Sequence, residues 1–177
     1  ENLGSRTAQI ADSCPAFTGG VPVFSLRDVC FSAGGREILS GVTFEIPKGS
    51  RLLLLGENGC GKTTLLRLIA RLYKPTRGAI VQHIGEKFGQ KPKGSRAWYK
   101  KVGVVYQNPD YQLFMPTVLK EIAFGAESEE YAREIASLFG VGHLLDRHPQ
   151  SLSEGQKRRV SIAAVAACKP EVLLLDE

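Results

Sequence analysis

The chain has 177 residues, a net charge of +5 and 43% hydrophobic residues, which is typical of one well-packed globular domain and is too short for two. No apolar run reaches the roughly 18–20 residues that a membrane helix needs, which excludes a chain that crosses the bilayer by itself. The cysteines show neither a close pair nor a zinc-like spacing, so we expect reduced thiols, as in a cytosol-like compartment, at Cys14, Cys30, Cys60 and Cys168.

The first segment, residues 1–20, is rich in Ser, Thr, Ala and Gly and has no apolar periodicity. This composition is typical of a linker from an upstream domain or of the remains of a targeting peptide, and we favour the linker. The folded domain is therefore expected to cover residues 21–177.

Two segments then alternate apolar and polar residues, which predicts half-buried strands. They cover residues 23–30 and 41–50, and Pro47 and Gly49 close the second. Residues 51–55, RLLLL, form instead a short continuous apolar run. Such a run is typical of a strand buried on both faces of a central sheet.

The next elements predict a helix followed by two strands. Leucine and isoleucine recur on one stripe over residues 62–74, a pattern that ends before Pro75. Residues 78–84 and 101–107 are rich in β-branched residues and are expected to form strands.

The segment between these two strands, residues 82–101, accounts for the whole net charge of the chain, with six basic residues against one acid. A basic patch can bind nucleic acid or anionic lipid. Glycine and proline interrupt this one, so we favour a solvated loop. The basic residues are Lys87, Lys91, Lys93, Arg96, Lys100 and Lys101.

A helical region of about 108–155 follows. Helices are expected over residues 117–125 and 128–140 and from 153 to 169, with Thr117, Ser128 and Ser153 as N-cap residues. The apolar run 171–175 then predicts a closing strand that delivers Asp176 and Glu177 to a site.

One motif predicts a binding function by itself. Residues 56–63 fit G-x-x-x-x-G-K-[ST] and lie between a predicted strand and a predicted helix, the context that a phosphate-binding loop requires. Glycines let the backbone N–H groups point inward toward phosphate oxygens, while a lysine reaches the terminal phosphates and a hydroxyl binds Mg²⁺. We therefore expect ATP binding by Gly56, Glu57, Asn58, Gly59, Cys60, Gly61, Lys62, Thr63 and Thr64.

Three further segments narrow the choice among proteins with such a loop. Residues 152–156, LSEGQ, resemble the signature motif of ATP-binding-cassette (ABC) ATPases. Residues 102–107, VGVVYQ, resemble the strand that ends in the Q-loop glutamine, and residues 171–177, EVLLLDE, resemble the Walker B strand. In this order they make the chain, from about residue 22, similar to an ABC ATPase domain.

The resemblance implies a fold and a set of roles. The fold is α/β: a P-loop NTPase core with a mainly parallel central sheet, an N-terminal antiparallel β subdomain and an α-helical insertion. Thr63, Gln107 and Asp176 would surround Mg²⁺, and Glu177 would be the catalytic base that orients water. A partner's ATP would be contacted by the signature residues Ser153, Glu154, Gly155 and Gln156.

Two departures from the family are visible. The aromatic residue that stacks on adenine in family members is matched by Ala33, with Phe31 as a candidate substitute. Losing the stacking would weaken nucleotide binding by about tenfold or more, since it is worth about 1–3 kcal/mol. The family also continues beyond the catalytic glutamate with a switch histidine. We therefore expect chain beyond Glu177, and little hydrolysis by these 177 residues alone.

Residues 107–125 resemble more narrowly the ATPases of energy-coupling-factor and cobalt/nickel-type importers. This resemblance implies an ATPase on the cytoplasmic face of the membrane, or its plastid equivalent, that drives uptake of a vitamin or metal ion. Its partners would be a second ABC ATPase subunit, bound head to tail, and a transmembrane permease that docks near residues 110–117. The alternatives are a soluble ABC ATPase acting on nucleic acid or ribosomes, which we do not favour, and a non-hydrolysing nucleotide-binding module.

Overall fold

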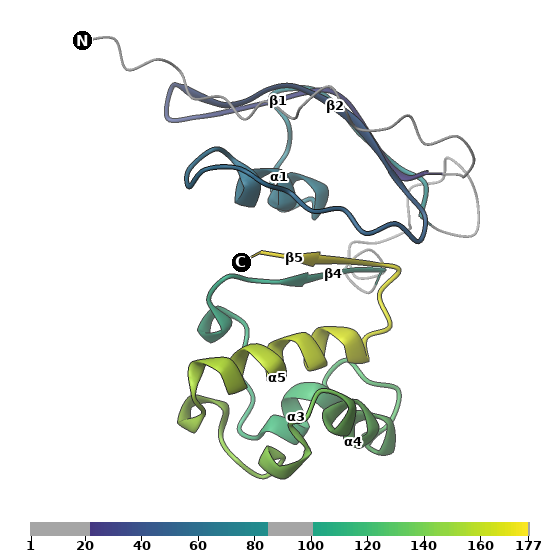
Figure 1. Cartoon of the computed structure of the whole chain (residues 1–177), viewed down its shortest axis with the longest axis vertical. Coiled ribbons are helices and arrows are strands. Elements are labelled where there is room, and N and C mark those ends of the chain that lie inside the picture. Colours follow the sequence, from purple (N-terminus) through teal and green to yellow (C-terminus); the bar gives the residue numbers. More distant parts are fainter. Residues whose placement is uncertain (1–21, 85–100, 177) are drawn as a thin grey trace. The chain divides into compact units, whose positions relative to one another are not determined.

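The computed structural model describes residues 22–84 and 101–176, which belong to two compact units, one within residues 1–91 and one within residues 92–177. Three predicted features lie outside the described residues: the linker 1–20, the basic segment except for its two ends, and Glu177. Figure 1 shows the strands and helices of each unit.

The first unit is built on an antiparallel sheet in the order β2-β1-β3. The strands are β1 (Pro22–Ala33), β2 (Arg36–Pro47) and β3 (Arg77–Gln82). β1 and β2 form a hairpin whose two turn residues, Gly34 and Gly35, both have positive φ, as the favoured two-residue hairpin turn requires. The predicted alternating strands are thus confirmed, and they are longer than expected.

One helix, α1 (Lys62–Ile69), belongs to this unit and buries Leu65, Leu68 and Ile69. It is shorter than the predicted helix over 62–74. Its end is a Schellman motif: Arg71 has φ +61°, and Leu72 N–H donates to Arg67 O at 2.9 Å. The apolar stripe continued past this point, but the left-handed backbone at Arg71 ends the helix.

The prediction of a buried strand over residues 51–55 is wrong for this structure. The run has no strand conformation and pairs with no strand among the described residues. Leu53 and Leu55 are 73% and 83% exposed. A strand is stable only when a neighbouring backbone takes its hydrogen bonds, and within the first unit β2, β1 and β3 pair only with one another.

The second unit contains a parallel pair, β4 (Val102–Val105) and β5 (Val172–Leu175). Both strands were predicted, but β5 is less buried than its sequence suggested: Leu174 is 7% exposed and Leu173 is 42% exposed. Gly103 on β4 lets the segments around Val165 and Pro170 approach closely. A Cβ at Gly103 would lie 3.1 Å from Pro170 Cγ and would also collide with Val165, which belongs to the helix before β5.

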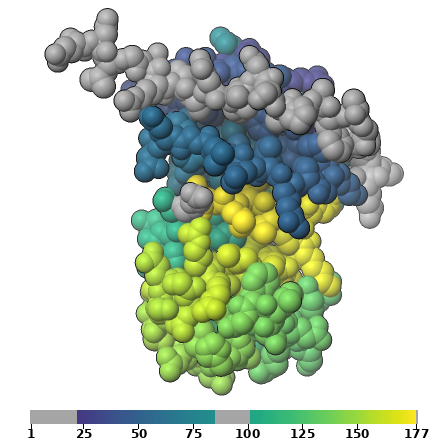
Figure 2. All heavy atoms as spheres, viewed as in Figure 1, coloured from purple at the N-terminus to yellow at the C-terminus, as the bar shows by residue number. Residues whose placement is uncertain are grey.

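Between β4 and β5 the chain is helical. The helices are α3 (Val118–Ala123), α4 (Glu129–Leu138) and α5 (Glu154–Ala167), with short 3-10 turns η1 (Pro109–Tyr111), η2 (Gly142–Leu144) and η3 (Pro149–Ser151). They share a core that includes Val118, Ile122, Ala136 and Val160. On the face seen in Figure 2, the green and yellow-green atoms of this region form one continuous surface.

The predicted helix starts are confirmed. Thr117 Oγ1 accepts from Lys120 N–H at 3.3 Å, and Ser128 Oγ accepts from Tyr131 N–H at 3.1 Å. Ser153 is the N-cap residue of α5, and its N–H donates to Gln156 Oε1 at 3.0 Å. Each polar cap satisfies a backbone group that the first helical turn leaves without a partner.

Candidate functional site

The predicted phosphate loop, residues 56–63, follows the apolar run 51–55, and its last two residues begin α1. Gly61 is the N-cap residue of α1 with φ +104°, and a Cβ there would lie 2.8 Å from Leu39 Cδ2. Gly59 has φ +82°, with nothing within 4 Å of the added Cβ. Glycine is therefore needed at both positions for the backbone angle, and at Gly61 also for space.

Lys62 reaches back over this loop. Its Nζ donates to Gly56 O at 2.7 Å and to Glu57 O at 3.0 Å. The loop is tightened further by a hydrogen bond from Cys60 N–H to Glu57 O at 3.3 Å. The ammonium group thus lies among the residues of the loop, where the motif needs it for contact with phosphate oxygens. Thr63 and Thr64 occupy the first turn of α1.

Gln107 and Asp176 follow the carboxyl ends of β4 and β5, which are neighbours in the parallel pair. Asp176 N–H donates to Val105 O at 2.9 Å, which continues the ladder beyond the strands. The second unit therefore brings Gln107 and Asp176 to the same edge of its sheet. A carboxylate and an amide oxygen are ligands that suit Mg²⁺, so these two residues fit the predicted role.

The signature residues form the start of α5. Ser153 precedes the helix, and Glu154, Gly155 and Gln156 lie in its first turn. A Cβ on Gly155 would meet nothing within 4 Å. The N-terminal end of a helix carries partial positive charge and N–H donors, which suit an anion, so the position fits the predicted contact with a partner's nucleotide.

The structure also shows contacts that the sequence did not predict. Lys157 Nζ lies 2.7 Å from Asp110 Oδ1. Arg158 donates to Gln107 O and to Asp176 O, each at 3.4 Å. The only sequence signal for these roles is the position of the two basic residues directly after the signature motif.

Glu121 is a second residue that the sequence analysis missed. It is a buried carboxylate of α3, and one of its oxygens, Oε2, accepts from Phe114 N–H at 2.9 Å and from Met115 N–H at 2.7 Å. It holds the turn within the segment that resembles importer ATPases. An acidic residue near a helix start is too common a pattern to identify such a role.

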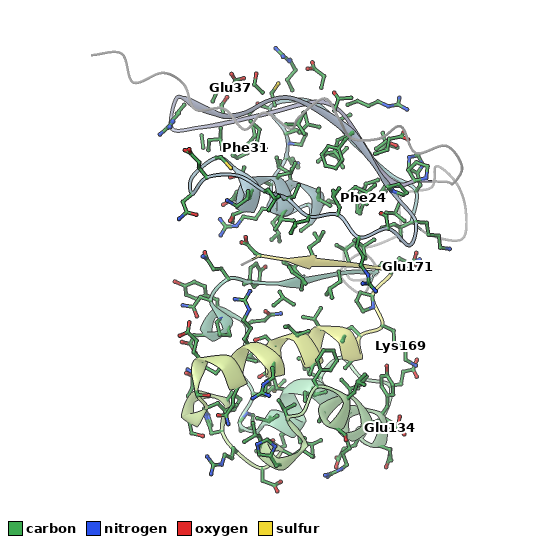
Figure 3. The ribbon with its side chains drawn as sticks, in the orientation of Figure 1. Phe24, Phe31, Glu37, Glu134, Lys169 and Glu171 are labelled. Carbon is green, nitrogen blue, oxygen red and sulfur yellow. The ribbon has the colours of Figure 1, made fainter. Side chains whose placement is uncertain are left out.

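The two residues considered for stacking on adenine, Ala33 and Phe31, lie near the end of β1. Ala33 ends β1 at the hairpin. Phe31 stacks on Tyr73 with ring centroids 5.4 Å apart and planes at 1°; Figure 3 shows Phe31 and Phe24 toward opposite ends of β1. One face of the Phe31 ring is thus covered by Tyr73, and stacking of Phe31 on a base stays a prediction.

The site residues therefore form two groups, each within one unit. The phosphate loop with α1 belongs to the first, and Gln107, Asp176 and the signature residues belong to the second. Within residues 22–84 and 101–176, no three His, Cys, Asp or Glu side chains gather as a metal site. In the same residues, no helix has the length and apolar character needed to cross a bilayer.

Comparison with known families decides the identity: the profile described as ABC transporter matches residues 39–177. The chain belongs to the ABC transporter family. The match includes the phosphate loop, Gln107, the signature motif and both acids of the closing strand, so the resemblance noted in the sequence is confirmed at the level of the family.

Among the ABC relatives, the energy-coupling factor transporter ATP-binding protein EcfA2 of Bacillus licheniformis is 48% identical over 154 residues, which cover 80% of this chain and 53% of that protein. The nickel import ATP-binding protein NikO of Rhodobacter capsulatus is 42% identical over 168 residues, which cover 88% of this chain and 66% of that protein. The chain thus spans about half to two thirds of the length of these relatives.

A solved structure supports the fold. The structure of cbiO1 from Clostridium perfringens, part of the ABC transporter complex cbiONQ, superposes with a TM-score of 0.72 at 30% identity, and the match covers 88% of this chain and 65% of that one. The ABC chain described here therefore has the P-loop NTPase fold of ABC ATPase domains, with its antiparallel sheet, parallel sheet and helices.

Proposed function

We propose that this ABC domain binds Mg²⁺-ATP and belongs to an ATP-hydrolysing subunit that drives uptake of a vitamin or metal ion through a membrane permease. The observation that carries the proposal is the phosphate loop: Lys62 lies on the loop carbonyls and left-handed glycines shape the turn into α1. The names of the importer relatives support the transport class.

The residues divide the chemistry between them. Backbone N–H groups of residues 56–63 and the Lys62 ammonium would hold the phosphates, where positive charge lowers the cost of charge developing in the transition state. Thr63, Gln107 and Asp176 would hold Mg²⁺, which neutralises phosphate charge when bound. Glu177, beyond the described residues, would orient the attacking water.

The remaining parts would serve partners. Ser153, Glu154, Gly155 and Gln156 would contact the ATP of a second ABC domain, bound head to tail. Residues 110–117, whose turn is held by Glu121, would face a helix of the permease. This arrangement would place the protein on the cytoplasmic face of a membrane.

The test is the ATPase rate of the intact protein with its membrane partner. Lys62→Ala and Asp176→Asn should each lower kcat by about 100-fold or more, because each removes a charge that holds the phosphates or Mg²⁺. Lys74→Ala, which removes an exposed lysine beyond α1, should leave the rate unchanged. A Lys62→Ala protein as active as Lys74→Ala would refute the proposal.

The transported substrate needs its own measurement. Cells that lack the gene should lose uptake of one labelled vitamin or of nickel or cobalt ions, and the wild-type gene should restore it while the Asp176→Asn gene should not. Normal uptake of all of these substrates in the deletion strain would contradict the importer assignment without affecting the ATPase test.

A further inference from the structure

One turn of α5 connects the segments that follow both strands of the parallel pair. Arg158 Nη1 donates to Gln107 O and Arg158 Nη2 donates to Asp176 O, each at 3.4 Å. These hydrogen bonds are long, but the donor is charged, which strengthens them. The guanidinium group thus bridges the backbone of Gln107 and Asp176, two of the three predicted Mg²⁺ ligands.

The chemistry of the carbonyls explains why arginine suits this position. At the carboxyl edge of a parallel pair, the last C=O groups of neighbouring strands lie side by side. Some of these carbonyl groups have no N–H of a further strand from which to accept a hydrogen bond. A guanidinium group presents several N–H donors in a fixed plane and can serve two acceptors at once, whereas a lysine ammonium acts as a single point charge. Arg158 is partly buried, which limits competition from water.

A second contact fixes the same segment further on. Lys157 Nζ lies 2.7 Å from Asp110 Oδ1, and the lysine side chain is only 14% exposed. The same Nζ lies 3.3 Å from Gln150 Oε1. Two consecutive residues of α5 therefore hold the chain at Gln107 and again at Asp110.

The helix that carries these contacts also carries the signature motif. Ser153 and Gln156 define the start of α5, and Arg158 lies less than one turn beyond Gln156. A helix moves as a rigid element over such a length, so a displacement of the backbone at Gln107 or Asp176 changes the position of the signature residues as well.

We propose that Arg158 is a positioning residue that fixes the backbone carrying Gln107 and Asp176 and ties it to the signature helix. Lys157 assists through Asp110. The inference rests on the proposed function, because it takes Gln107 and Asp176 as the Mg²⁺ ligands of the second unit. Arg158 touches neither nucleotide nor metal in this role, and it acts through the two residues that do.

The experiment measures ATP binding by the intact protein, in EDTA and across a Mg²⁺ titration. In EDTA, affinity depends on the phosphate loop, and Arg158→Gln should match the wild type within about twofold. The Mg²⁺ concentration for half-maximal tightening should rise about tenfold in Arg158→Gln, as expected when support for metal ligands is lost. In Arg158→Lys this Mg²⁺ concentration should rise less, since lysine keeps the positive charge but lacks the planar set of N–H donors that can serve two carbonyl groups.

The matched control is Arg133→Gln, which removes an arginine from α4 whose partner is the exposed Glu129. It should leave both ATP affinities unchanged. A second readout needs no ligand: amide hydrogen exchange at residues 106–112 and at Asp176 should be faster in Arg158→Gln than in Arg133→Gln, because the bridge no longer holds the backbone.

The results separate the inference from the proposed function. Equal Mg²⁺ dependence in Arg158→Gln and the wild type would overturn the inference alone. An equal loss of affinity in EDTA and in Mg²⁺ would also overturn it, because the residue would then act only on the fold. If Arg158→Gln does not fold, Arg158→Lys carries the same comparison. A wild-type protein that binds ATP equally with and without Mg²⁺ would refute the proposed ligands themselves.

Discussion

Two apolar runs of similar composition have different structures in this chain. Residues 51–55 and 171–175 both place leucines in succession, and both precede residues of the predicted site. The second run contains β5, paired in parallel with β4, whereas the first has no strand conformation and exposes Leu53 and Leu55. The composition is shared, so the difference lies in what each run contacts.

The second run has three features that the first lacks among the described residues. It has a partner strand, β4. This partner strand is covered by α5, which can approach because Gly103 has no Cβ. Its start is fixed by Glu171 N–H donating to Lys101 O at 2.8 Å and by an ion pair between the same two residues. Apolar composition thus gives a segment the tendency to form a strand, and neighbouring elements decide whether it does.

The largest expected difference is in the free energy of unfolding, when one leucine of each run is replaced by alanine. Leu174→Ala should lower the free energy of unfolding of the 177-residue chain by about 2–4 kcal/mol, because a buried side chain is lost. Leu53→Ala, at an exposed position, should change it by less than about 0.5 kcal/mol. Urea unfolding followed by circular dichroism measures both. Equal losses would mean that residues 51–55 are packed in solution.

The packing of α5 against β4 can be broken separately. Gly103→Ala places a Cβ against Val165, Pro170 and Leu173 and should cost about 1–3 kcal/mol by overpacking. Gly155→Ala adds the same methyl group where nothing lies within 4 Å, so it should not destabilise the chain. The two variants are compared by thermal unfolding, and a Gly103→Ala protein as stable as Gly155→Ala would contradict the close approach.

The smallest effect concerns the ion pair at the start of the pair of strands. Lys101 Nζ lies 2.7 Å from Glu171 Oε1, with side chains 30% and 47% exposed. Lys101→Ala should cost about 0.5 kcal/mol, as is usual for partly exposed ion pairs. The difference from the wild type should shrink in 1 M NaCl, since salt screens exposed charges. A loss that does not depend on salt would show that Lys101 stabilises the strand through packing.

Local signals in the sequence predicted much of the fold and of the site. The N-caps at Thr117, Ser128 and Ser153 formed because a polar side chain before an apolar stripe satisfies the helix by itself. The phosphate loop was likewise predictable, since its glycines and lysine act within a few residues of each other. The roles of the site residues stay predictions until they are measured.

Features that depend on distant contacts were not predictable. The end of α4 at Gly140 carries a visible signal, since glycine adopts the left-handed conformation readily. Arg71 and Lys169 adopt the same conformation after α1 and α5, and neither residue type signals it. The contacts of Arg158 join residues 107, 158 and 176, and no spacing in the sequence shows that these positions meet.

The position of Lys62 affects how nucleotide affinity should be understood. Its ammonium already has two oxygen partners in the loop, Gly56 O and Glu57 O. Binding of phosphate is then an exchange of backbone oxygens for phosphate oxygens, and affinity reflects the difference between the two sets. The lysine is already held in place, so it should lose little further rotamer freedom on binding. Part of its attraction for phosphate is offset by the two carbonyl contacts that it gives up.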